Sequence, residues 1–134
     1  MTSKYNVLYK TGGGDDIMKD LNDTLTHFFQ HQIQIKMLHF TTKNHDHHKI
    51  FDDYLAKFSS KFDKLMEVGQ GYIKNRVSLQ KLEVDITNDE NKIIDDMLTY
   101  TNTLMAKFSN TPLTNIIDDM RADILQMKYL LTFE

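Results

Sequence analysis

The sequence of 134 residues contains no cysteine, no tryptophan and only one proline. Without cysteine the chain forms neither disulfide bonds nor thiolate metal sites, and nothing argues for secretion. No apolar run approaches the ~20 residues that a membrane-spanning helix needs, and the N-terminus lacks the apolar core of a signal peptide. We therefore expect an intracellular, cytoplasmic protein that has no membrane partner. The length suits one domain with a real core.

The chain also has no excess of positive charge, because 16 lysine and arginine residues stand against 19 aspartate and glutamate residues, for a formal net charge of −3 at pH 7. Residues 1–14 end in three glycines, show no helical period and contain only two basic residues, Lys4 and Lys10. They are predicted to be a flexible tail, followed by one helical domain over residues 15–134. Six to ten phosphate contacts are typical of salt-sensitive DNA binding, and this tail does not supply them. We expect binding to DNA to be weak or absent.

Apolar residues recur at steps of three and four in four segments, and no segment alternates as a strand does. This pattern predicts an all-α fold, a four-helix bundle with a long irregular connection (72–87) between the second and third helices. On the first helix, Phe29, Ile33, Met37 and Phe40 are expected to widen the buried line. The predicted helices run from Asp15 or Asp16 to about Thr41, from His48 to the glycines Gly69 and Gly71, from the N-cap Thr87 to about Ser109, and onward from the N-cap Thr111 with Pro112 at its first position.

Besides its apolar positions, the second predicted helix carries a stripe of polar and small residues: His48, Asp52, Ala56, Ser59, Asp63 and Glu67. Their spacing of four and three places them in one line along the helix. Asp52 and Asp63 are eleven residues apart, which is ~16 Å of helical rise, so no single ion bridges them. Polar residues at this spacing also form ordinary solvated surfaces, and that interpretation remains open at this point.

A second copy of the helix, running antiparallel across a two-fold axis near Ala56 and Ser59, would bring the polar residues of the stripe together. It would place the partner's Asp63 and Glu67 beside His48 and Asp52, creating two equivalent sites shared between subunits. His39, just before the helix, is able to join them, and His45 and His47 in the preceding turn are alternatives to it. Imidazole and carboxylate ligands suit iron, zinc or manganese. His27 and His31 are four residues apart, but without a matching carboxylate a polar or interface role is favoured for them.

The same residues carry a family resemblance. His39-Phe40 followed by H-x3-D-x10-D-x3-E (His48, Asp52, Asp63, Glu67) resembles the ferroxidase segment of the Dps family of mini-ferritins, and Leu82–Ile86 resembles the entry into that family's third helix. Phe40 stands where the family usually has tryptophan, and both the loop after it and the later connection are shorter. No E-x-x-H motif occurs, so the site inside each bundle that larger ferritins use is excluded.

The resemblance implies a ferritin-like bundle that binds Fe(II) and oxidises it, with hydrogen peroxide as the family's usual oxidant, and that stores the ferric product and limits oxidative damage. It implies the ligands, which are also the catalytic residues: His39, His48 and Asp52 from one subunit, and Asp63 and Glu67 from the partner. It implies iron at the site, zinc or manganese as substitutes, a homodimer and a cage of twelve. The alternative is a non-catalytic helical scaffold, or a nucleoid-associated DNA-binding protein with a vestigial metal site.

Overall fold

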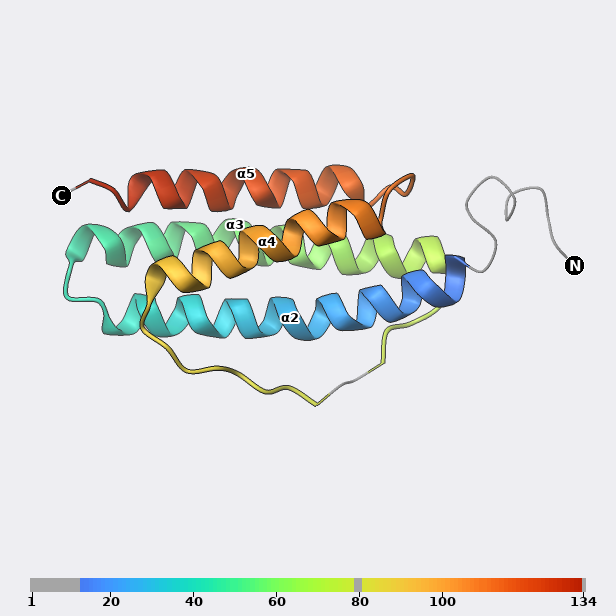
Figure 1. Cartoon of the computed structure of the whole chain (residues 1–134), viewed down its shortest axis with the longest axis horizontal. Helices are drawn as coiled ribbons and strands as arrows, with labels where there is room; N and C mark the ends of the chain where they lie inside the picture. Colours follow the sequence, from blue (N-terminus) through green and yellow to red (C-terminus); the bar gives the residue numbers. More distant parts are fainter. Residues whose placement is uncertain (1–12, 79–80, 134) are drawn as a thin grey trace, which may run out of the picture.

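Four helices pack side by side and confirm the predicted all-α four-helix bundle (Figure 1). The computed structural model describes residues 13–78 and 81–133, and no strand occurs within these ranges. In these ranges no helix is long and apolar enough to cross a membrane. The predicted tail lies outside the described residues, except for Gly13 and Gly14, which belong to the first helix. The helices are α2 (Gly13–Thr41), α3 (His45–Ile73), α4 (Glu90–Lys107) and α5 (Thr114–Leu130).

The long connection between α3 and α4 follows from the direction of the helices. Helices α3 and α4 run the same way along the bundle, so the chain has to return along its length between them (Figure 1). The α3 helix of 29 residues is ~43 Å long, and segment 74–89 reaches ~50 Å when extended. The segment passes beside α2 and is attached to it twice: Ser78 N donates to Asn22 Oδ1 (2.7 Å), and Gln34 Nε2 donates to Asp85 O (3.0 Å).

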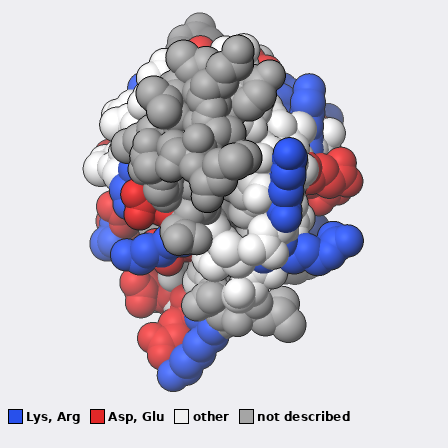
Figure 2. Space-filling model, turned by 90° about the vertical axis from the view of Figure 1, so that its right-hand side faces the viewer, with Lys and Arg blue, Asp and Glu red and all other residues white. Residues whose placement is uncertain are grey.

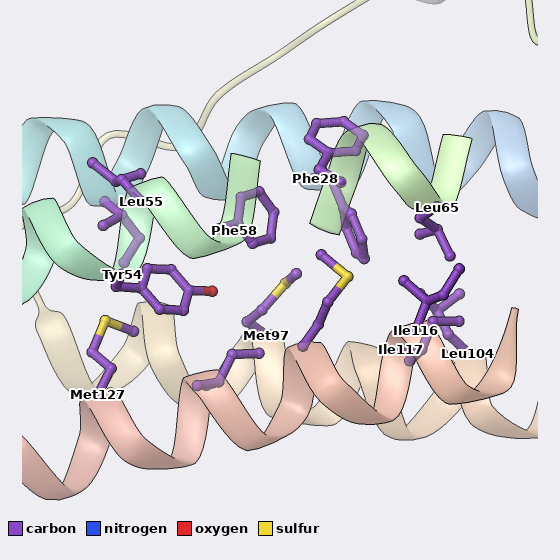
Figure 3. Packing of buried hydrophobic residues seen from close by; sticks show 14 of the residues in the cluster. Phe28, Tyr54, Leu55, Phe58, Leu65, Met97, Leu104, Ile116, Ile117 and Met127 are labelled. Atoms are coloured by element: carbon purple, nitrogen blue, oxygen red, sulfur yellow. The ribbon is translucent and has the colours of Figure 1, made fainter. Parts of the chain in front are cut away.

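The core is built from the apolar stripes of all four helices. Phe28 of α2 meets Phe58 of α3 near the middle of the bundle, while Met97 of α4 and Met127 of α5 close the core from the other side (Figure 3). Each such side chain contributes about 1.5–3 kcal/mol by leaving water. The flexible methionines fill the spaces between the rings.

The second helix differs from its predicted bounds at both ends. Asn44 is its N-cap, with Oδ1 accepting from His47 N at 3.1 Å, so the histidine cluster 45–48 forms the first helical turn and not a loop. Gly69 and Gly71 do not end the helix, which continues to Ile73. The helix stops at Lys74, whose φ of 54° is left-handed.

The other helix starts also shift by a few residues. Asp89, and not Thr87, caps α4, because its Oδ1 accepts from Lys92 N (3.1 Å) and Thr87 Oγ1 accepts from Asp89 N (3.1 Å). Helix α5 begins at Thr114. Thr111 Oγ1 still accepts from Leu113 N at 3.2 Å, but in a turn that precedes the helix.

Candidate metal centre

His39 and His48 meet where α2 ends and α3 begins. His39 Nδ1 lies 2.9 Å from the carbonyl oxygen of His48, and His48 Nδ1 lies 2.7 Å from the carbonyl oxygen of His39. A carbonyl oxygen only accepts, so each Nδ1 carries a proton and donates it. In the neutral ring this leaves both Nε2 atoms with a free lone pair, which is how metal-binding histidines are commonly held.

The short turn between the helices produces this reciprocal pair. Residues 42–44 are the only ones between Thr41 and His45, and Thr42 N still donates to Leu38 O at 2.9 Å, so α2 ends tightly before Asn44 starts α3. The two imidazole rings consequently stack with centroids 3.9 Å apart and planes 18° from parallel. His39 is buried and His48 is half-buried.

The three carboxylates of the expected site are exposed on the outer flank of α3. Asp52, Asp63 and Glu67 all face solvent, and the small residues Ala56 and Ser59 separate the first from the other two. The single chain therefore brings together only the two histidines of the five expected ligands. Within the described ranges, no three histidine or acidic side chains gather in an arrangement that could hold a metal ion.

An apolar row on α2 lies beside this flank of α3. The expectation that Phe29, Ile33, Met37 and Phe40 are buried is wrong, because their exposed fractions are 43%, 37%, 36% and 70%. One face of α2 already fills the core, and these four residues lie toward the other side of the helix. They are only partly covered: Phe29 packs edge-on against Phe62 of α3, with ring centroids 5.1 Å apart. Between α2 and the stripe lies a shallow groove of about 500 Å³, lined by Ile33, Lys36, Asp52, Ala56 and Ser59 among others.

The two alternative histidine ligands have different surroundings. His47 is half-buried, with Nδ1 3.5 Å from Glu90 Oε1 of α4 and its ring edge-on to Phe51. His45 is exposed, and its ring is nearly parallel to that of His48 with centroids 6.3 Å apart. Of the two, His45 is the one whose ring stacks toward the His39–His48 pair.

Residues 39–131, more than half of the chain, match the model of a family of unknown function (DUF5856). The chain belongs to this family. No curated protein and no solved structure matches the sequence. The part of this DUF5856 chain that the family model matches begins at His39 and includes all five expected ligands.

A second polar pair in this DUF5856 chain was missed by sequence reasoning. His31 Nε2 lies 2.7 Å from the hydroxyl of Tyr54, and both residues are almost fully buried. Burial, with a smaller contribution from His27, lowers the pKa of His31 to about 3, and burial raises the pKa of Tyr54. His31 lies on the apolar stripe of α2 and Tyr54 on that of α3. A polar side chain at such a position is the one signal in the sequence for a buried hydrogen bond.

Proposed function

We propose that the protein is a Dps-like ferroxidase and iron-storage protein whose substrate is Fe(II). The observation that carries the proposal is the His39–His48 pair, in which backbone carbonyls fix both rings and leave both Nε2 atoms free. Ligating histidines are commonly held in this way, with the second ring nitrogen donating to a carbonyl or carboxylate.

The proposed site is completed by a second copy of the chain across a two-fold axis. His39, His48 and Asp52 would come from one subunit, and Asp63 and Glu67 from its partner. Three features support this: the carboxylates are exposed, small residues stand between them, and the apolar row on α2 next to them is partly exposed. Contiguous exposed apolar surface in a single chain commonly marks a protein interface. By the same resemblance, further contacts would close a shell of twelve subunits.

The chemistry of such a site favours oxidation of iron. Carboxylate oxygens stabilise Fe(III) more than Fe(II), because the higher charge strengthens their ligation. One hydrogen peroxide molecule takes one electron from each of two Fe(II) ions and, with two protons, leaves as two water molecules. Storage of the ferric product removes both reagents that generate hydroxyl radicals, so the protein would protect against oxidative damage. Zinc or manganese would occupy the same ligands without this turnover.

A complementation experiment tests the shared site. Asp52→Ala removes a ligand from one side of the interface, and Glu67→Ala removes one from the other. Each homodimer should lose Fe(II) oxidation at both sites, measured by ferric absorbance, by at least about tenfold to a hundredfold. After co-refolding of the two variants, each heterodimer has one site with both residues mutated and one intact site, so activity should return to a substantial fraction of wild type.

Asp53→Ala is the matched control, because Asp53 is exposed on the same helix turn but lies off the stripe. It should leave oxidation unchanged. If every mixture of Asp52→Ala and Glu67→Ala chains stayed inactive, the shared site would be wrong. Purified protein that neither contains nor takes up iron would favour a non-catalytic scaffold, and a monomer that binds iron tightly would exclude the two-fold arrangement.

A further inference from the structure

A separate cavity of about 420 Å³ lies between α2 and α4, partly covered by the connection that precedes α4. Its charged residues, Asp85, Lys92 and Asp96, are all exposed, so they stand at its mouth. Lys92 Nζ and Asp96 Oδ2 already form an ion pair at 2.8 Å. The inner wall contains side chains that are uncharged at neutral pH, among them His31 and the half-buried Gln30.

His31 is the most deeply buried polar residue that lines the cavity. The residue is only 2% exposed, its Nε2 is bound to Tyr54, and it lines the cavity. Within the described residues, His31 Nδ1 has no hydrogen bond, and His31 is one of the residues that line the cavity.

The Tyr54 hydroxyl decides which nitrogen of His31 carries the proton. In the described part of the chain this hydroxyl has no hydrogen-bond partner other than His31 Nε2. If Nε2 donated, the hydroxyl proton of a buried tyrosine would have no acceptor, which is costly. The hydroxyl therefore donates to Nε2, and the neutral ring carries its proton on Nδ1. His31 consequently offers an N–H donor to the cavity.

Two side-chain amides stand one turn apart on the same helix as His31. Gln34 uses its Nε2 to donate to Asp85 O, which leaves its Oε1 free to accept. The amide of Gln30 makes no hydrogen bond within the described residues, so both its N–H and its oxygen are available. Met97 and Ile93 add an apolar wall. The cavity thus combines donors and acceptors with apolar surface and has no charge in its interior.

We propose that this cavity binds an uncharged small molecule that carries a carbonyl oxygen next to an N–H group, as nucleobases and other cyclic amides do. The carbonyl accepts from His31 Nδ1, and the neighbouring N–H donates to the oxygen of Gln30 or Gln34. The flat ring packs against Met97. An ion would enter an interior without a compensating charge, which disfavours it. The volume lies within the usual range for small-ligand sites.

Uracil is the probe, added to protein labelled with 15N-histidine and followed by 1H–15N correlation spectra. The free protein should show a protonated Nδ1 for His31, and uracil should shift that signal saturably, with a dissociation constant of about 1 mM or tighter. The variant His31→Phe/Tyr54→Phe removes both partners of the buried hydrogen bond, so no polar group is left unpaired. This double variant and Gln30→Leu should each raise the dissociation constant for uracil, measured by calorimetry, about tenfold or more.

Two variants serve as matched controls outside the cavity. His45→Asn and Asp52→Ala should bind uracil as the wild type does, and the second separates this proposal from the proposed iron site. Four results would overturn the proposal: an unprotonated His31 Nδ1, no saturable shift up to about 10 mM uracil, acetate or glucose binding as tightly as uracil, or unchanged affinity in both cavity variants.

Discussion

Two glycines of α3 provide a sharp test of how closely α2 and α3 pack. Gly69 is buried, and a Cβ built on it would lie 2.8 and 2.9 Å from the two δ carbons of Leu21. Gly71 is exposed, and a Cβ there would have no neighbour within 4 Å. Both positions lie inside the same helix. Gly69→Ala and Gly71→Ala therefore both gain from the helical preference of alanine, with a smaller gain at Gly71 near the helix end, and only Gly69→Ala introduces the close contact.

The expected effects have opposite signs. Replacing glycine by alanine inside a helix stabilises by up to about 0.5–1 kcal/mol, and Gly71→Ala should show a gain with no contact to oppose it. Carbon atoms pack best at about 3.5–4 Å, so the methyl group that Gly69→Ala introduces would be too close to Leu21. The δ carbons of Leu21 would have to shift among the packed side chains that bury this residue, and overpacking of this kind costs about 1–3 kcal/mol. Gly69→Ala should therefore destabilise by about 1 kcal/mol.

Thermal and urea unfolding, followed by circular dichroism, measure the difference. A gap of about 2 kcal/mol between the two variants corresponds to roughly 8 °C in Tm. Leu21→Val removes the δ carbons, so Gly69→Ala should become neutral or stabilising in that background, as a double-mutant cycle would show. Equal stabilisation by both glycine substitutions would refute the close approach of the two helices. The close approach would also be refuted if Gly69→Ala destabilised the protein by the same amount with and without Leu21→Val.

Three further outcomes are expected. His31→Phe leaves the buried Tyr54 hydroxyl without its partner and should cost about 1–3 kcal/mol in urea unfolding, most of which His31→Phe/Tyr54→Phe should restore. Burial lowers the pKa of His31 from 6.5 to about 3. Between these two pH values the unfolded chain binds a proton at His31 and the folded chain does not, so the free energy of unfolding should fall as the pH is lowered through this range. The fall should be less steep in His31→Phe/Tyr54→Phe, which lacks this histidine. Basic and acidic side chains are interspersed on the described surface seen in Figure 2, so a gel shift at ~0.15 M salt should show no sub-micromolar binding to duplex DNA.

The sequence was sufficient for the fold class because helical periodicity is a local property. The spacing of apolar residues, the single proline at 112 and the irregular stretch after Gly71 define four helices and one long connection. Helix ends were predicted less well, because several residues compete to cap each helix. Asp89 and not Thr87 caps α4, since the nearer carboxylate reaches the free N–H of Lys92.

For the candidate metal centre, too, the sequence determined one part and the tertiary structure the other. The line from His48 to Glu67 is a consequence of helical spacing alone, so the sequence determined that these side chains share one flank of α3. The sequence did not determine that His39 and His48 exchange hydrogen bonds, because that contact depends on how tightly two helices turn into each other. Nor did it indicate that the row from Phe29 to Phe40 stays partly exposed, because a periodic apolar pattern does not say which side of a wide stripe faces the core.

Buried polar contacts depended most on tertiary structure. His31 and Tyr54 are 23 residues apart, and each looks like an ordinary member of an apolar stripe until two helices bring the ring nitrogen and the hydroxyl together. The same holds for Gly69, which local propensity treats as a helix breaker and which the packing of Leu21 retains inside the helix. Local sequence determined which residues are helical and which share a face. The distances between helices decided which contacts those faces make, because hydrogen bonds and close contacts change over a few tenths of an ångström.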